Sequence, residues 1–417
     1  MCGICGIVNF DGSPVQQGRL KSMMQAIKHR GPDDEGSYLD NNAGFGFMRL
    51  SILDLSSSGH QPMFEESGRY MLIFNGEVYN YIELRKELNQ AGYTFHSNTD
   101  TEVVLKAYLH WGEDCLRRFN GMWAMAIYDT QKKEIFISRD RYGIKPFYYY
   151  FDAYTFAFAS EIPSLLKVLP HKPSANQQAI FDYLVFNCTD HTEQTFFQGI
   201  YKLPHGHNIR LQTVNRHSPS HNKRLKIKQW YHLSDQVSTA TPFENPMEYK
   251  QLFASSVGLR LRSDVPVGVC LSGGLDSSSI VSSLLQDHQK NDLHTFSTVY
   301  AQGERGDESA FISAWQTRLT NMHYTHPTAK DLYSDMQSFV RAHAEPIPTT
   351  SPYAQYKVME LASKNVVVTL DGQGADEQLA GYHYFYGFWF KDLLRQVALY
   401  RLLREMAAYG KMHKSLY

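Results

Sequence analysis

The sequence has little of what marks a nucleic-acid-binding or membrane protein. Its 41 basic and 42 acidic residues nearly cancel, so the formal net charge is -1 over 417 residues. That balance gives no electrostatic reason to expect nucleic acid or an anionic membrane as a partner. No apolar run approaches the ~18 residues of a membrane span, and the first residues carry no basic stretch followed by an apolar one. We therefore expect a soluble protein that binds neither membranes nor nucleic acid.

Cysteine is also scarce. The chain contains five, an odd number and mostly far apart: Cys2, Cys5, Cys115, Cys188 and Cys270. This spacing argues against a disulfide framework and favours a reducing, cytoplasmic setting. With 43% hydrophobic and 20% charged residues, the composition is that of a globular protein, and the length fits two or three domains.

The first 160 residues mix short helices with strands. Apolar residues from Leu20 to Ile27 recur at helical spacing, and Gly31-Pro32 is expected to stop that helix. YIELRKELNQAG and TEVVLKAYLHWG are two further helical stretches, each ending at a glycine. The strand-like runs are WAMAIYD, EIFISRD, FYYYFD and TFAFAS, with TQKK a hairpin connection between the first two. Strands with few helices indicate two packed sheets.

The composition changes between about residues 205 and 247. HSPSHNKRLKIK and STATPFENP are polar, with scattered proline and serine, which is typical of a surface excursion and a linker. After them, the apolar runs VPVGVCL, LHTFSTVY and NVVVTL alternate with helical stretches. This rhythm predicts a parallel α/β sheet with helices on both faces.

The string SGGLDSS, from Ser272 to Ser278, lies between an apolar strand and a helix. Gly273 and Gly274 allow a tight turn, and the following helix offers unpaired N–H groups, so the loop suits a phosphate chain. Asp276 would repel phosphate unless it holds Mg²⁺, which bridges carboxylate and phosphate oxygens. The alternative is a plain turn in which Asp276 and the serines cap a helix.

A second glycine-rich loop, DGQGADEQLAGY, follows NVVVTL and begins at Asp371. Loops at the carboxyl ends of neighbouring parallel strands converge on one crevice. Asp371, Asp376 and Glu377 can therefore face Asp276 across bound ATP and Mg²⁺. The alternative is a capped turn with solvated acids.

The chain begins MCGICGIVNFDG, with cysteines at positions 2 and 5. A thiol needs a base to become a thiolate, and its ordinary pKa is about 8.5. If Met1 is removed, the α-amine of Cys2 can serve as that base. The rival is a redox or zinc pair, but CxxC here precedes any strand and no second ligand pair accompanies it. We expect Cys2 to be the nucleophile and Cys5 to be packing.

Four other positions fit chemistry beside a thiol nucleophile. Asn75 and the N–H of Gly76, after the strand MLIF, can donate to an oxyanion. Arg49 can bind an α-carboxylate, and Asp100 can accept from an α-ammonium. The alternatives are a turn, a surface arginine and a helix N-cap. Together the residues indicate hydrolysis of an amino-acid side-chain amide.

These motifs resemble those of glutamine-hydrolysing asparagine synthetases. The matching strings run in family order from residue 1 to about 390: MCGICGI, HRGPDDEG, RLSILD, HQPM, FNGEVYNY, TDTEV, GMWAMAIYD, RDRYGIKPFYY, ASEI, KLPHGH, SDVPVGVCLSGGLDSS and GQGADE. The resemblance implies a fold of mixed class (α+β then α/β). An N-terminal-nucleophile αββα sandwich would be followed by a parallel-sheet α/β ATP-pyrophosphatase domain of the adenine nucleotide alpha hydrolase-like type. The domains would be a type 2 glutamine amidotransferase at 2–210, an excursion and linker at 211–244, and the synthetase domain at 245–417.

The resemblance also assigns roles to residues. Cys2 would attack the glutamine amide, with Asn75 and Gly76 as oxyanion hole. Glutamine would be held by five residues: Arg49, Asn75, Gly76, Glu77 and Asp100. ATP would be bound by Leu271, Ser272, Gly273, Gly274, Asp276, Ser277, Thr298, Asp371 and Gly372, with Mg²⁺ on Asp276 and Asp376. Ammonia would pass through an interior channel and displace AMP from an aspartyl adenylate, giving asparagine.

Two departures from the family pattern bear on that reading. The family loop reads SGEGADE, whereas this chain has DGQGADE. The glutamate linked to intermediate formation is therefore Gln373, which cannot act as a base. Family members also continue past residue 417, so we expect a C-terminally truncated synthetase half.

The acceptor stays open between aspartate and another carboxylate, such as a sugar acid or peptide. A bare glutaminase or interaction module is a further alternative. The expected partners are small molecules, and a homodimer is one assembly to test.

Overall fold

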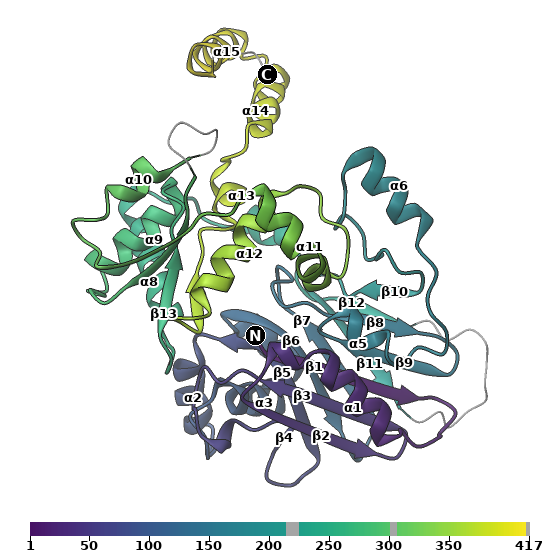
Figure 1. The fold of residues 1–417 in the computed structure, drawn as a ribbon. Helices are drawn as coiled ribbons and strands as arrows, with labels where there is room; N and C mark the ends of the chain where they lie inside the picture. The colour runs from purple at the N-terminus through teal and green to yellow at the C-terminus, as the bar shows by residue number, and fades with distance from the viewer. Residues whose placement is uncertain (214–224, 301–306, 414–417) are drawn as a thin grey trace. The chain divides into compact units, whose positions relative to one another are not determined.

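The computed structural model describes residues 1–213, 225–300 and 307–413, and the chain divides into two compact units (Figure 1). Unit 1 is Met1–Val267 with His326–Val368, and unit 2 is Gly268–Thr325 with Thr369–Tyr417. The predicted domain boundaries at 2–210, 211–244 and 245–417 stay predictions. Residues 214–224 of the predicted linker lie outside the described residues.

Unit 1 contains two six-stranded sheets. The first has the order β10-β8-β9-β1-β3-β2 and the second β12-β11-β7-β6-β5-β4. The strands of the first are β1 (Gly3–Asn9), β2 (Asp34–Asp40), β3 (Ala43–Arg49), β8 (Tyr148–Phe151), β9 (Thr155–Ala159) and β10 (Ile200–Lys202). Those of the second are β4 (Met63–Phe64), β5 (Tyr70–Val78), β6 (Gly121–Asp129), β7 (Glu134–Arg139), β11 (His207–Gln212) and β12 (Lys226–Gln229). Neighbouring strands in both sheets run antiparallel, and β6 and β7 form the predicted hairpin.

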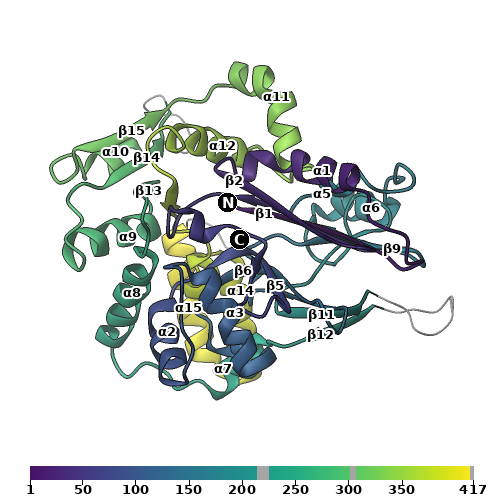
Figure 2. The same cartoon turned by 90° about the horizontal axis from the view of Figure 1, so that it is seen from below.

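Helices cover the outer faces of both sheets, as Figure 2 shows. The helices of this unit are α1 (Gln17–Ala26), α2 (Tyr81–Gln90), α3 (Asp100–Trp111), α4 (Cys115–Arg118), α5 (Ile162–Leu165), α6 (Gln177–Phe186), α7 (Leu233–Thr239), α8 (Pro246–Arg260), α11 (Ala329–His343) and α12 (Ser351–Ala362). One apolar cluster fills the space between the sheets, a second lies under α1 and α5, and a third lies under α2 and α3. The αββα sandwich is confirmed.

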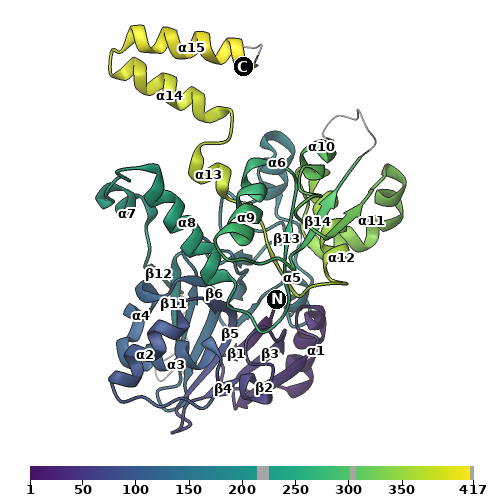
Figure 3. The ribbon, with the colours of Figure 1, turned by 90° about the vertical axis from the view of Figure 1, so that its left-hand side faces the viewer.

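Unit 2 is built on a four-stranded sheet of order β15-β14-β13-β16. Its strands are β13 (Val267–Cys270), β14 (His294–Thr298), β15 (Asn321–Thr325) and β16 (Val368–Leu370). Its helices are α9 (Leu275–Gln286), α10 (Ser309–Ser313), α13 (Ala375–Leu379), α14 (Tyr384–Arg395) and α15 (Leu399–His413). β13, β14 and β15 pair in parallel, which confirms the predicted parallel α/β sheet. The last two helices pack side by side (Figure 3).

The segment expected to be excursion and linker holds regular structure where it is described. β12 pairs with β11 at the edge of the second sheet, and α7 follows it. No helix among the described residues combines the length and the apolar content needed to cross a bilayer.

Candidate active site

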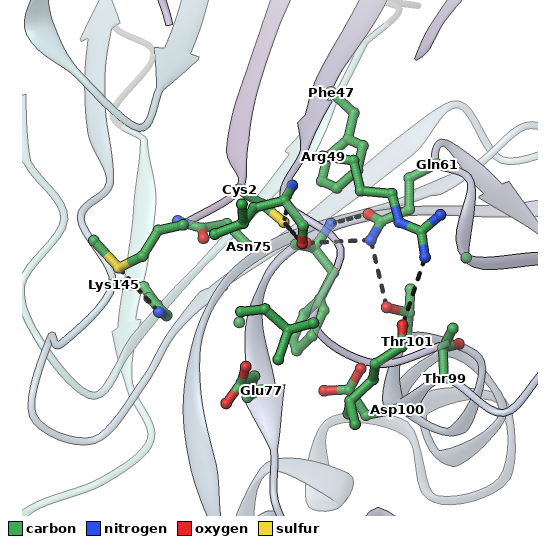
Figure 4. Close-up of a pocket in the computed structure, with 17 residues that line it drawn as sticks. Cys2, Phe47, Arg49, Gln61, Asn75, Glu77, Thr99, Asp100, Thr101 and Lys145 are labelled. Atoms are coloured by element: carbon green, nitrogen blue, oxygen red, sulfur yellow. Dashed lines mark hydrogen bonds between the residues drawn. The ribbon is translucent and has the colours of Figure 1, made fainter. Parts of the chain in front are cut away.

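One pocket in unit 1 brings together every residue that the sequence predicted for glutamine chemistry (Figure 4). Its lining residues are Met1, Cys2, Phe47, Arg49, Leu50, Ile52, Leu53, Gly59, Gln61, Phe74, Asn75, Gly76, Glu77, Thr99, Asp100, Thr101 and Lys145.

Strand alternation explains why the pocket lies where it does. Side chains two positions apart point to the same face of a strand. In β3, Phe45 and Phe47 belong to the core between the sheets, so Arg49 continues that face beyond the last apolar residue. In β5, Met71 and Ile73 belong to the same core, and Asn75 comes next. The pocket is thus the polar end of the core between the two sheets.

Cys2 enters the pocket just before β1. Its Sγ accepts a hydrogen bond from the Leu50 N–H at 3.4 Å and lies 3.5 Å from the Leu50 carbonyl oxygen. Burial raises the pKa of the thiol, while the Leu50 backbone and the nearby cations oppose that rise. Cys5 lies in β1 and is fully buried in an apolar cluster, and neither cysteine is in a disulfide. The prediction that Cys5 is packing is confirmed.

Asn75 and Gly76 lie side by side within β5, paired with β6, so the expectation that they follow the strand and the alternative of a turn are both wrong. The Asn75 amide is buried, and neither its oxygen nor its nitrogen has a hydrogen-bond partner. A Cβ added at Gly76 would lie 2.5 Å from the Met122 carbonyl oxygen of β6, so the position accepts only glycine. An unpaired buried amide on a pocket wall is suited to bind an oxygen that develops charge.

Arg49 is 6% exposed, so the alternative of a surface arginine is wrong. Its guanidinium donates to the carbonyl oxygens of Ser56 at 2.7 Å, Asp54 at 2.5 Å and Leu53 at 3.5 Å. A guanidinium has five N–H donors, so two remain for a ligand. The loop that accepts these hydrogen bonds packs closely against the Arg49 guanidinium, because a Cβ added at Gly59 would lie 1.9 Å from Arg49 Nη2.

Glu77 and Asp100 supply the acids of the pocket. Burial raises the pKa of both carboxyls, that of Asp100 to about 7. The Asp100 carboxylate accepts the Val78 N–H at 2.8 Å. The N-cap of α3 is Thr99, whose hydroxyl accepts the Glu102 N–H at 3.2 Å. The alternative that Asp100 caps this helix is therefore wrong.

Polar side chains without a separate prediction also line the pocket, among them Gln61, Thr101 and Lys145. Gln61 is buried and holds Phe74, its amide accepting the Phe74 N–H at 2.6 Å and donating to the Phe74 carbonyl oxygen at 3.3 Å. It also donates to the Thr101 hydroxyl at 3.4 Å. Lys145 enters from the loop between β7 and β8. The signals that could have found two of them are the strings HQPM and RDRYGIKPFYY, which hold Gln61 and Lys145.

In unit 2, the SGGLDSS loop joins β13 to α9. Gly273 has φ +84°, a left-handed conformation that favours glycine. No side chain caps α9, so its first-turn N–H groups stay available to an anion. The Ser277 hydroxyl accepts the Ser272 N–H at 3.2 Å, which closes the loop on itself. Leu271 donates its N–H to the Phe296 carbonyl oxygen of β14, whose last residue is Thr298.

The Asp371 loop follows β16 and meets α9. A Cβ at Gly372 would lie 2.9 Å from Asp276 Cβ, so these two backbones are in close contact. Burial and then the negative charge of Asp376 raise the pKa of the Asp276 carboxyl. Gln373 is exposed. The predicted ATP residues therefore gather at the carboxyl ends of β13, β14 and β16.

The described residues contain no cluster of three or more His, Cys, Asp or Glu that could ligate a metal. Asp276 and Asp376 offer two carboxylates, and Mg²⁺ is typically held by one or two carboxylates with phosphates and water completing its shell. The pair fits that ion only together with a phosphate-bearing ligand.

Comparisons with known proteins match both halves of the chain to families. Residues 1–222 match the family described as glutamine amidotransferase domain, and residues 248–416 match the family described as asparagine synthase. A Methanocaldococcus jannaschii protein named "Putative asparagine synthetase (glutamine-hydrolyzing) 2" is 36% identical over 95% of this chain and 78% of its own length. Asparagine synthetase (glutamine-hydrolyzing) 1 of Bacillus subtilis is 33% identical over 92% of this chain and 59% of its own length. The chain thus spans between about three fifths and four fifths of the length of these two relatives.

Among solved structures, a glutamine phosphoribosylpyrophosphate amidotransferase from B. subtilis covers 78% of this chain and 65% of its own. Its TM-score is 0.40 at 12% identity, a likeness too slight to carry an argument.

Proposed function

Because the chain belongs to the family of glutamine-hydrolysing asparagine synthetases, we propose that it hydrolyses glutamine at Cys2 and uses the ammonia for an ATP-driven amidation. Aspartate is the acceptor we propose first, with asparagine as product. The observation that carries the proposal is the single pocket in which Cys2, Arg49, Asn75 and Asp100 meet.

The first half-reaction follows from the pocket. Arg49 binds the α-carboxylate of glutamine through its two remaining donors, and Glu77 and Asp100 accept from the α-ammonium. After Met1 is removed, the amine of Cys2 takes the thiol proton and Sγ attacks the amide carbon. The oxyanion is held by Asn75 Nδ2 and the Gly76 N–H. The C–N bond then breaks, the proton passes to the departing ammonia, and water releases glutamate.

The second half-reaction belongs to the loops of unit 2. The α9 N-terminus and the glycines of SGGLDSS bind the ATP phosphates, while Thr298, Asp371 and Gly372 flank the nucleotide. Mg²⁺ held by Asp276 and Asp376 would neutralise phosphate charge. The acceptor carboxylate attacks the α-phosphate and releases pyrophosphate, and ammonia then displaces AMP. Excluding water from the site protects the acyl adenylate formed in the first of these steps from hydrolysis.

Gln373 favours a second candidate, amidation of another carboxylate. A neutral amide replaces the glutamate that family members carry in this loop, and it cannot accept a proton from ammonium at neutral pH. A cytoplasmic location and a homodimer complete the proposal and rest on composition and resemblance alone.

ATP–pyrophosphate exchange across a panel of carboxylates tests the acceptor. We expect exchange that depends on aspartate, with asparagine formed when glutamine is added. Exchange with a sugar acid or peptide but not with aspartate would replace the first candidate with the second. Glutamate formation with no exchange on any acceptor would leave a glutaminase.

A further inference from the structure

Lys145 is the one cation on the pocket wall to which the proposed reaction assigns no role. It is 4% exposed and lies in the loop between β7 and β8. Its backbone is fixed on both sides, because its N–H donates to Asp140 Oδ2 at 3.0 Å and its carbonyl oxygen accepts from Arg139 Nε at 2.8 Å. These two hydrogen bonds fix the point at which the side chain leaves the backbone.

The ammonium of Lys145 forms no ion pair with any carboxylate in the part of the chain that the structure describes. Its Nζ instead donates to the thioether sulfur of Met1 at 3.1 Å, as Figure 4 shows, and a thioether is a weak acceptor. Burial lowers the pKa of Lys145, with Glu77 and Cys2 acting against that shift. An unpaired buried charge is costly, and such groups concentrate at functional sites.

The start of the chain lies among charges of both signs. Arg30, from the turn after α1, donates from Nε to the Cys2 carbonyl oxygen at 2.9 Å, and Lys145 adds a second cation. Glu77 of β5, Asp100 of α3 and Asp140 are acids of the same region. Arg30 is itself paired with Glu161 at 2.8 Å. Burial is the main cause that lowers the pKa of the Met1 α-amine to about 6, and Arg30 and Lys145 add to it.

We propose that Lys145 is a positioning residue of glutamine hydrolysis: its fixed charge makes the amine and thiol of the processed Cys2 lose their first proton at lower pH. The inference rests on the proposed function. A neighbouring cation favours loss of that proton whichever of the two groups releases it. The remaining proton then moves from sulfur to nitrogen as Sγ attacks, and leaves with ammonia. Removal of Met1 also removes the thioether sulfur that accepts the hydrogen bond from the Lys145 ammonium.

The test is the pH dependence of kcat for glutamine hydrolysis at saturating glutamine, on enzyme whose intact mass shows that Met1 is absent. Saturation keeps Asp100 paired with the substrate ammonium, so its own titration does not enter. We expect Lys145→Met to move the acid limb of the pH profile of kcat up by about one pH unit. At a fixed pH on that limb, turnover is then about tenfold slower than in wild type. The plateau at high pH should be recovered. Lys145→Arg should restore the wild-type limb, and Lys132→Met, at an exposed hairpin position, should match wild type.

If the acid limb of the kcat profile lies at the same pH in Lys145→Met as in wild type, the inference is wrong, whatever the plateau rate. Lost packing alone would lower the rate at every pH without moving the limb. Lys145→Gln is measured in parallel, and the shift must appear in each variant that folds. The rate of Cys2 alkylation by iodoacetamide against pH gives the same comparison without turnover. Wild-type enzyme that forms no glutamate would contradict the proposed function instead, so the two failures are distinct.

Discussion

At the residue scale, the buried side-chain amide of Asn75 gives the clearest indication of a catalytic role. Its two polar atoms have no partner, and a buried unpaired polar group costs about 1–3 kcal/mol. We expect Asn75→Ala to lower kcat for glutamine hydrolysis by roughly 10²–10³-fold, with KM within a few-fold and the melting temperature unchanged or higher. Steady-state kinetics and thermal unfolding measure both.

Asn208 of β11 offers the matched control. Its amide is also buried without partners, but it does not line the pocket. Asn208→Ala should therefore leave kcat near wild type. Full kcat in Asn75→Ala would remove this residue from the reaction.

Asp100 gives the pocket a dependence on pH. Burial raises its pKa to about 7, whereas an unfolded aspartate titrates near 3.9. Between about pH 4 and pH 7 the native state therefore holds a proton that the unfolded state has lost. The contribution of Asp100 to the free energy of unfolding falls as pH rises through that window and levels off above it.

Asp100→Asn should remove this loss. We expect the melting temperature of the variant, compared with that of wild type at the same pH, to be higher at pH 8 than at pH 5. Its KM for glutamine should rise at least about tenfold, because the substrate ammonium loses a charged acceptor. Thermal unfolding at the two pH values is the measurement. A difference between variant and wild type that does not change with pH would contradict the burial argument.

The sequence predicted the pocket residues whose chemistry is local. Cys2, Arg49 and Asn75 were recognisable because a nucleophile, a carboxylate binder and an amide donor each stand beside an apolar run of sequence. Lys145 and Gln61 were not singled out, because their place depends on loops that meet only after the sheets pair. No local pattern distinguishes such residues from surface ones.

At the scale of elements, helices and hairpins with strong periodicity were predictable. α2 and α3 end within two residues of the glycines that mark them, and TQKK joins β6 to β7. The first helix ends earlier than predicted, at Ala26, because a separate 3₁₀ turn at Lys28–Arg30 precedes Gly31-Pro32. β12 was hidden because an exposed edge strand reading KIKQ carries no apolar face.

The contact between the Asp371 loop and α9 makes its own prediction. A Cβ at Gly372 would lie 2.9 Å from Asp276 Cβ and 3.0 Å from the Ser277 nitrogen. Gly372→Ala must therefore push the two loops apart, and we expect ATP affinity to fall at least about tenfold with glutamine hydrolysis unchanged. Titration calorimetry with ATP and Mg²⁺ measures this.

Gly387→Ala is the matched control, because an added Cβ there meets no atom within 4 Å. It should bind ATP as wild type does. Equal affinity in Gly372→Ala would mean that these loops do not form the nucleotide site.

At the scale of the whole molecule, the change of rhythm along the chain predicted the architecture. Runs of strands with few helices predicted the two packed sheets, and apolar runs separated by helices predicted the parallel sheet. The acceptor could not be predicted, because Gln373 departs from the family loop and the specificity of a pocket depends on side chains that only the folded chain brings together.

The central claim is that a two-site amide ligase takes its nitrogen from glutamine at Cys2. Glutamate formation from glutamine by Cys2→Ala and Cys5→Ala, beside wild type, tests it most directly. Both variants lose a sulfur at the start of the first sheet, but only Cys2 lines the pocket. We predict no glutamate above background from Cys2→Ala and activity within a few-fold of wild type from Cys5→Ala. Glutamate formation by Cys2→Ala at the wild-type rate would contradict the account.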